Sequence, residues 1–189
     1  MDIDKIEKGF RMVMEGLGLD LNSPHLKDSP QRTAEAWQQE LCSGLREPPP
    51  VIQPYPIEEG FKPGLIALQH IPVKSLCAHH FLPFMGHAVV AFLPDQSYCG
   101  LSNLSKVVDH FARRPQLQEH LTHDIARFME TTLAPKGVGV MIRASHACME
   151  MRGVNHPGLM TTTTFLGVFE NDATLRAEFM SLADDGGGN

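Results

Sequence analysis

Two short segments combine residue types that bind metal ions and move protons. Cys77, His79 and His80 lie within four consecutive positions, and His146 and Cys148 follow about seventy residues later. Thiolates and imidazoles suit a zinc ion. Cys77 and His80 could bind from one tight turn, and Cys148 could complete a set of three ligands. Such a set leaves one tetrahedral position for water, as in a catalytic zinc site. His79 and His146 would then be imidazoles beside the metal, placed to move protons.

A structural interpretation of these residues also stands. An isolated Cys-x-x-His pattern is weak evidence for a metal, and most isolated buried cysteines are simply small core residues. Cys42 and Cys99 have no nearby Cys or His in a recurring ligand pattern, so we expect both to be ordinary core or surface residues.

Composition describes a folded protein of moderate size and excludes several classes. The 189 residues fit one domain with a small appendage, and 42% hydrophobic residues are enough for a core. The formal net charge of -6 argues against general nucleic-acid binding. No apolar run approaches membrane-spanning length, and the acidic N-terminus is unlike a signal peptide. Four cysteines without framework spacing indicate a reducing, cytoplasmic location.

The N-terminal part predicts two helices and a linker. Apolar residues recur at helical spacing from Ile3 to Leu17. A second helix is expected with Ser29 as its N-cap and Pro30 at its first position, which places Arg32 in the first turn, where a cation opposes the helix dipole. Residues 46–63 contain six prolines and predict an extended linker.

The remaining chain predicts paired strands alternating with paired helices. Strands are expected at 64–74, 84–93, 138–144 and 160–169. Helices are expected from Ser102, as an N-cap, to about 112, then from about 117 to 133, and at 174–182. This order favours an α+β fold with an antiparallel sheet. Because Cys77 and Cys148 each follow a strand, a rigid sheet could position both thiols.

Several segments, in order and at the expected spacings, resemble the GTP cyclohydrolase I family. The resemblance covers roughly residues 25–182, and several motifs in register are more specific than any single one. The segments that carry it are 28–32 (DSPQR), 75–84 (SLCAHHFLPF), 100–102 (GLS), 113–119 (RRPQLQE), 145–154 (SHACMEMRGV), 167–169 (GVF) and 176–179 (RAEF).

This resemblance implies the tunnelling fold (T-fold), in which strands and helix pairs from several subunits form a toroidal barrel. The implied assembly is a homodecamer of two pentamers with active sites at subunit interfaces. The expected organisation is an N-terminal helical arm at 1–47, a T-fold catalytic domain at 48–184 and a disordered tail at 185–189.

The resemblance also implies a reaction. Zinc (Zn2+) bound by Cys77, His80 and Cys148 would activate water for attack on C8 of the guanine of GTP, while His79 and His146 shuttle protons. Formate would leave, and rearrangement would give 7,8-dihydroneopterin triphosphate, the first step of folate and pterin biosynthesis.

The substrate contacts implied by the family fall on six positions. Gln118 and Glu119 match residues that bind guanine, and Ser102 matches a residue near the ribose and phosphates. The cations expected near phosphate are Arg152, Arg32 and Lys106.

Three positions depart from the family pattern. Ala78 stands where a glutamate is usual, Asn103 where a phosphate-binding lysine is usual, and Lys106 where an arginine is usual. Asn103 removes a positive charge, and Lys106 keeps the charge but cannot form the bidentate hydrogen bonds of an arginine. They leave two alternatives open: a divergent cyclohydrolase that acts on another purine nucleotide, and a non-catalytic, zinc-stabilised regulatory or scaffold subunit.

Overall fold

The structure is a computed structural model that describes residues 1–153 and 155–184. By its contacts the chain divides into two compact units, one spanning Met1–Pro48 and the other beginning at Pro49. Each is described by itself. The predicted disordered tail at 185–189 lies outside the described residues.

The N-terminal unit is a pair of helices. Helix α1 (Ile3–Gly16) begins after Asp2, whose carboxylate accepts a hydrogen bond from the Lys5 backbone at 3.0 Å. Helix α2 (Ser29–Ala36) continues into a π-helical turn (Trp37–Leu41) and a short 3-10 turn (Ser43–Leu45). The rings of Phe10 and Trp37 join the two helices edge to face at 5.3 Å. The prediction of Ser29 as N-cap was wrong by one residue: Asp28 holds the cap position, and Ser29 is already helical.

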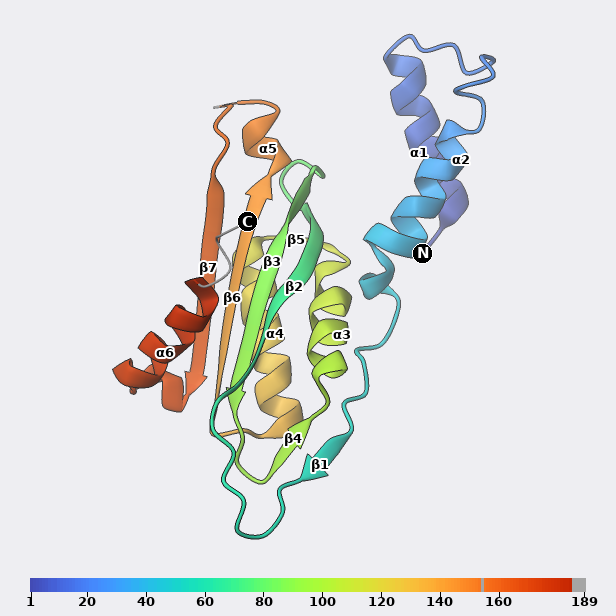
Figure 1. Cartoon of the computed structure of the whole chain (residues 1–189). Coiled ribbons are helices and arrows are strands. Elements are labelled where there is room, and N and C mark those ends of the chain that lie inside the picture. Colours follow the sequence, from blue (N-terminus) through green and yellow to red (C-terminus); the bar gives the residue numbers. More distant parts are fainter. Residues whose placement is uncertain (154, 185–189) are drawn as a thin grey trace. The chain divides into compact units, whose positions relative to one another are not determined.

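The second unit is built on a curled sheet with strand order β5-β2-β3-β6-β7 (Figure 1). The long strands are antiparallel neighbours: β2 (Ile66–Cys77), β3 (Pro83–Leu93), β6 (Gly137–His146) and β7 (Leu159–Gly167). The short strand β5 (Pro115–Gln116) pairs with β2 in parallel. The predicted linker also contains a strand, β1 (Pro54–Pro56), which pairs with β4 (Ser97–Cys99).

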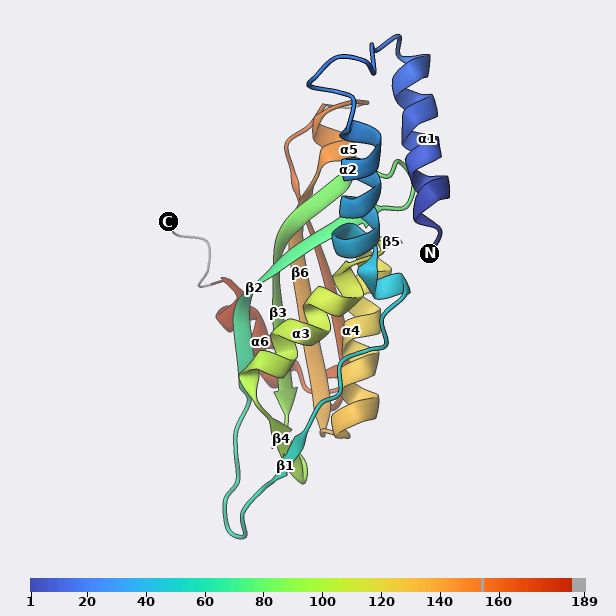
Figure 2. The same ribbon diagram turned by 90° about the vertical axis from the view of Figure 1, so that its right-hand side faces the viewer.

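Two helices cover one face of this sheet. Helices α3 (Leu101–Ala112) and α4 (Gln118–Leu133) lie across β2, β6 and β7 (Figure 2). The predicted apolar stripe of α3 is fully confirmed, because Leu104, Val107, Val108 and Phe111 are all buried in the main core. The predicted capping role of Ser102 was wrong. Gly100 occupies the N-cap position, and Ser102 is the second helical residue.

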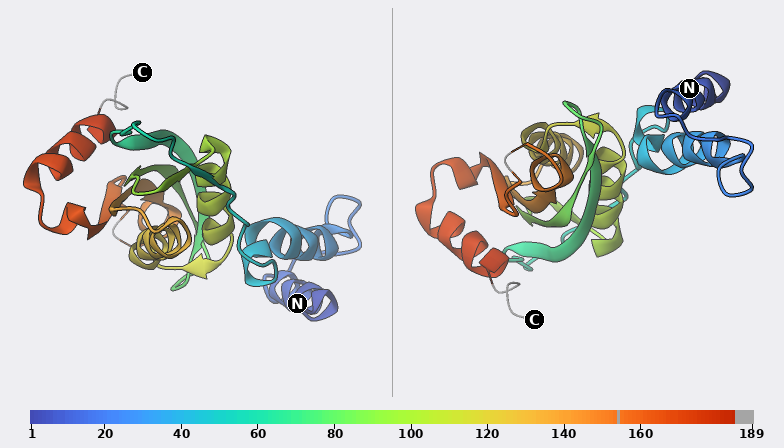
Figure 3. Two further views of the ribbon diagram at one scale, coloured as in Figure 1. Left: turned by 90° about the horizontal axis from the view of Figure 1, so that it is seen from below. Right: turned by 90° about the horizontal axis from the view of Figure 1, so that it is seen from above.

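The opposite face of the sheet carries a smaller apolar cluster under helix α6 (Ala173–Asp184). Figure 3 shows α6 on the side of the sheet away from α3. Phe169, from the 3-10 turn Val168–Glu170, and Phe179 are both completely buried there. The side chains of Gln69 and Arg143 donate hydrogen bonds to the carbonyls of Leu182 and Ala183, so strands β2 and β6 hold the last turn of α6.

The strand ends bring distant parts of the sequence to one end of the sheet. Cys77 ends β2, His146 ends β6, and the short helix α5 (Ala147–Glu150) follows at once. Helix α4 starts at the same end, because Gln116 pairs with Cys77 two residues before it. Among the described residues, no helix combines the length and the apolarity that a membrane span requires.

Candidate active site

A tight turn after β2 presents the first group of candidate residues. The Cys77 carbonyl accepts hydrogen bonds from the backbone N–H groups of His80 and Phe81, at 3.3 and 2.8 Å, and its own N–H donates to Leu82 at 2.8 Å. Phe81 has φ +55°, which is uncommon for a residue with a side chain. The turn leaves Cys77 buried and turns His79 and His80 outward, where both are exposed.

Two thiols and one imidazole converge at this end of the sheet. The ligand atoms of Cys77, His146 and Cys148 all lie within 4.8 Å of one another. Cys77 is 5% exposed and His146 is 8% exposed, whereas Cys148 is partly buried. Burial raises the pKa of the Cys148 thiol, and a hydrogen bond with Cys77 raises it further. Such a set of sulfur and nitrogen donors fits zinc.

His80, the predicted third ligand, lies outside this group. Arg152 Nη1 donates a hydrogen bond to His80 Nε2 at 2.6 Å. The structure therefore brings together Cys77 and Cys148 as predicted, but the imidazole beside them is that of His146. His80 and Arg152 line the same cavity.

His146 is held on two sides. Its ring stacks on Phe84 at 4.7 Å with an interplanar angle of 10°, and its Nε2 lies 2.8 Å from Gln118 Oε1. Burial lowers the pKa of His146, and the carboxylates of Glu119 and Glu150 oppose that effect in part. The ring is therefore favoured in its neutral form, in which one nitrogen can accept a proton or bind a metal.

Gln118 and Glu119 are neighbours in sequence with different surroundings. Gln118 is 1% exposed, and its carboxamide nitrogen donates to the carbonyls of Ile142 and Met160 and to Thr162. Glu119 is exposed in the first turn of α4, where the helix dipole favours a carboxylate. Among the described residues, the Glu119 carboxylate has no hydrogen bond of this kind, so of the predicted guanine-binding pair it is the side chain that is available to a substrate.

These residues surround one cavity of about 450 Å³. Its lining includes the two cysteines, the three histidines His79, His80 and His146, and Glu119 and Arg152. Ser102 and Lys106 do not line it, since both are exposed on α3. A cavity of this size, with thiols, imidazoles, a carboxylate and a guanidinium, can take a small polar molecule beside a metal ion.

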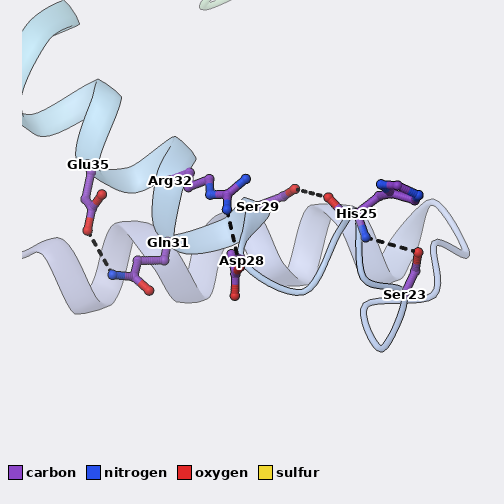
Figure 4. Close-up of polar contacts among 7 residues, drawn as sticks. All are labelled: Ser23, His25, Asp28, Ser29, Gln31, Arg32 and Glu35. Carbon is purple, nitrogen blue, oxygen red and sulfur yellow. Dashed lines mark hydrogen bonds and ion pairs between the residues drawn. The ribbon is translucent and has the colours of Figure 1, made fainter.

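Arg32 belongs to the N-terminal unit and is described there (Figure 4). Its guanidinium meets the Asp28 carboxylate at 3.4 Å one turn earlier, with both side chains exposed. The carboxylate of the N-cap residue Asp28 offsets the unfavourable position of a cation in the first turn of α2. Its predicted contact with phosphate stays a prediction.

Residue patterns missed some groups around the site. Gln116 is buried, and its carboxamide nitrogen donates to the Phe111 carbonyl, 2.6 Å away. Its Oε1 has no hydrogen-bond partner within the part of the chain that the structure describes. Thr162 supports Gln118 from β7, and Phe84 supports His146 from β3. A signal in the sequence for Gln116 was its place within the segment 113–119 that resembles the family.

Comparison with known proteins identifies relatives across nearly the whole chain. A family model described as GTP cyclohydrolase I matches residues 6–184. GTP cyclohydrolase 1 of Sulfurihydrogenibium sp. (strain YO3AOP1) is 42% identical over 183 residues, covering 96% of this chain and 95% of that protein. GTP cyclohydrolase 1 of Aquifex aeolicus (strain VF5) is 42% identical over 188 residues, covering 96% and 97%. GTP cyclohydrolase 1 of Geobacillus kaustophilus (strain HTA426) is 43% identical over 180 residues, covering 94% and 95%.

A similar solved structure is more distant. The archaeosine synthase QueF-Like in its apo form matches with a TM-score of 0.45 and 17% identity, over 55% of this chain and 96% of that one. A similarity at this level carries no argument about fold or activity.

Proposed function

Because the chain belongs to the GTP cyclohydrolase I family, we propose that it opens the imidazole ring of GTP by hydrolysis at C8, releases formate and forms 7,8-dihydroneopterin triphosphate. One observation supports this most directly. Cys77, His146 and Cys148 converge within 4.8 Å in a cavity that Glu119 and Arg152 also line. A metal-binding group, a proton-transfer group, a guanine partner and a phosphate partner are thus available in one place.

The donor set fits zinc, which Cys77 and Cys148 would hold with one imidazole. We assign that imidazole to His80, because it follows Cys77 in the same tight turn and lines the same cavity. His146 Nε2 is already engaged with Gln118, so its other nitrogen remains for proton transfer. When bound, zinc would supply Lewis-acid activation of water near neutral pH.

The remaining roles follow from the side chains. His146, whose neutral form is favoured because burial lowers its pKa, accepts a proton, and the exposed His79 returns one to a nitrogen of the guanine ring. Glu119 accepts hydrogen bonds from the guanine N1–H and its amino group, which together match a carboxylate. Arg152 lines the cavity beside His80, and its planar guanidinium can donate to two oxygens of a phosphate.

A single chain offers an incomplete set of phosphate contacts, which supports an oligomeric T-fold enzyme. Ser102 and Lys106 lie on α3 outside the cavity lining. In a toroidal decamer of two pentamers with sites between subunits, they would face the cavity of a neighbouring copy. Arg32 of the helical arm would add a further cation. The cytoplasmic location stays a prediction from the sequence.

The altered phosphate positions favour an alternative substrate class, another purine nucleotide. Asn103 is neutral, so one charge-assisted hydrogen bond worth roughly 1.5–3 kcal/mol would be missing, about ten- to a hundredfold in affinity. We expect Asn103→Lys to lower the KM for GTP with kcat little changed, as measured by steady-state kinetics. An unchanged KM would remove this argument.

The deciding experiment is turnover of GTP by the zinc-loaded full chain, with formate release and the fluorescence of the oxidised pterin measured together. Both signals, absent in Cys148→Ser, would support the proposal. Formate alone would indicate ring opening without rearrangement. Activity with another purine nucleotide but not GTP would favour the divergent enzyme. No activity with any of them would favour the non-catalytic subunit.

A further inference from the structure

We propose that Gln118 is a positioning residue, which fixes both the orientation of the His146 ring and the nitrogen that carries its proton. The catalytic importance of this role rests on the proposed function. The orientation of the His146 ring and the position of its proton can be tested without any turnover. This positioning role differs from the family-implied role of Gln118 as a guanine-binding residue, and the two roles predict different kinetics.

The first step concerns which way the Gln118 carboxamide points. Its nitrogen lies 3.0 Å from the carbonyl oxygens of both Ile142 and Met160. A carbonyl oxygen can only accept a hydrogen bond, so the atom facing both must be the NH2 group. The opposite orientation would set three oxygens against one another inside the core. The backbone of β6 and β7 therefore determines the orientation of the amide.

The second step is a closed chain of hydroxyl groups around the same amide. Gln118 Nε2 also lies 3.1 Å from Thr162 Oγ1, which lies 2.6 Å from Thr122 Oγ1, which donates to the Gln118 carbonyl at 2.8 Å. Since Thr122 gives its only hydroxyl proton to that carbonyl, Thr162 donates to Thr122, and its oxygen can share one of the two amide hydrogens of Gln118 with a carbonyl. Every group in this chain has a partner, so the amide has little freedom to rotate.

The third step transfers this orientation to His146. With its nitrogen fixed, Gln118 can present only Oε1 to His146 Nε2, at 2.8 Å. An oxygen acceptor requires a proton on Nε2, so a neutral His146 keeps its lone pair on Nδ1. Phe84, stacked at 4.7 Å, holds the plane of the ring. Nδ1 is therefore the nitrogen that can accept a proton in the cavity.

Burial favours this role over contact with substrate. Gln118 is 1% exposed, and both hydrogens of its amide are directed at acceptors within the protein. Binding guanine through this side chain would require those bonds to break. Gln118 is the first residue of α4 and lines the cavity beside His146, so its buried carboxamide can hold the ring from the wall of the cavity.

Steady-state kinetics of Gln118→Met separate the two roles. Methionine keeps the length of the side chain and removes every hydrogen bond. A positioning role predicts a fall in kcat of roughly 10–100-fold with KM for GTP unchanged, the usual size for a lost orienting partner. Gln69→Met is the matched control. It removes a partly buried hydrogen bond from a glutamine amide to the Leu182 carbonyl on the α6 side of the sheet. It should keep both constants. A raised KM with unchanged kcat would overturn the proposal.

A second measurement does not depend on turnover, and its main result comes from the wild-type chain. In the metal-free full chain labelled with 15N-histidine, His146, identified by its absence in His146→Asn, should show a protonated Nε2 and an unprotonated Nδ1. The Nε2 proton should exchange slowly with water and become fast in Gln118→Met. A proton on Nδ1 in the wild type would overturn the proposal even if GTP is turned over. The expected spectrum would support it even if GTP is not the substrate.

Discussion

Two histidines stand near the cysteine pair, and their surroundings suit different tasks. His80 is exposed, and its ring contacts the exposed side chains of Arg152 and His79, so we expect that it can move toward a metal at small cost. His146 is buried, stacked on Phe84 and bonded to Gln118, so it is held in one orientation. A ligand can rearrange when the metal binds, whereas a proton-transfer group benefits from a fixed geometry.

We therefore expect the two histidines to separate metal binding from turnover. His80→Ala should lower the zinc content per chain and abolish activity, whereas His146→Asn should keep the zinc and lose activity. Zinc content measured by atomic emission, together with GTP turnover, tests this. If instead His146→Asn loses the metal and His80→Ala keeps it, His146 is the third ligand.

The two cysteines outside the site should be chemically inert. Burial raises the pKa values of both Cys42 and Cys99, so the thiolate, which is the reactive form, is disfavoured at and above pH 7. As pH rises from 7 to 9, the folded protein should show little alkylation by iodoacetamide at either position, as measured by peptide mass spectrometry. The same chain in denaturant is the control. Rapid labelling of the folded protein would contradict the expected burial.

Residue types in the sequence suggested a metal site at Cys77 and Cys148 only weakly, and resemblance to the family made zinc the favoured interpretation. The structure brings both thiols together with an imidazole in a group that could hold a metal ion. The partnership of Gln118 with His146 could not be predicted. It depends on α4 packing against β6 and β7, so that side chains 28 positions apart meet. Local spacing contains no information on such a contact.

At the scale of elements, periodicity predicted the helices and strands well and their ends less well. The apolar stripe of α3 lies in the core as expected, because its spacing of three and four matches one helical face. Ser102 and Ser29 were each expected as caps, but the helices begin earlier or at the serine itself. Cap preferences are weak compared with tertiary packing, which fixes where a helix starts. Two-residue β5 carries no pattern of its own.

Gly86 should be essential for joining β3 to β6. It pairs with Ala144, and a Cβ added to it would overlap the backbone of Arg143 and Ala144. Gly86→Ala should therefore separate two central strands and cost about 3 kcal/mol or more. Gly64→Ala is the control, since a Cβ there meets nothing within 4 Å. Thermal unfolding followed by circular dichroism gives both values, and equal unfolding midpoints for the two variants would contradict this account.

At the scale of the whole molecule, the cations expected near phosphate come from separate parts of the chain. Arg152 lines the cavity, Lys106 lies on α3 outside it, and Arg32 lies in the separate N-terminal unit. Helical and strand patterns describe one chain at a time. The oligomer could therefore be expected only from resemblance to the family.

If neighbouring copies complete each other's sites, two impaired variants should restore activity together, as measured at a GTP concentration at which each variant alone turns over little substrate. Cys148→Ser removes a metal ligand, and Lys106→Ala removes a cation that a neighbour would use. Co-expressed, the two should form mixed oligomers in which some sites carry neither change, and GTP turnover should reappear. The pair Cys148→Ser and Cys77→Ser alters the same cavity and should stay inactive. Failure of the first pair in verified mixed oligomers would indicate that Lys106 acts within its own chain.

The position of the two cysteines also bears on folding. Cys77 ends β2 and Cys148 follows β6, with β3 lying between these strands in the sheet. A metal bound by both would close a loop of about seventy residues, and in the loop-entropy model a permanent link of that length stabilises by about 4 kcal/mol. Removal of the metal by a chelator should therefore lower the midpoint of thermal unfolding even without any nucleotide present. On this account the ion that serves the reaction also restricts the unfolded chain, and metal supply would govern how much of the protein persists as well as how fast each copy works.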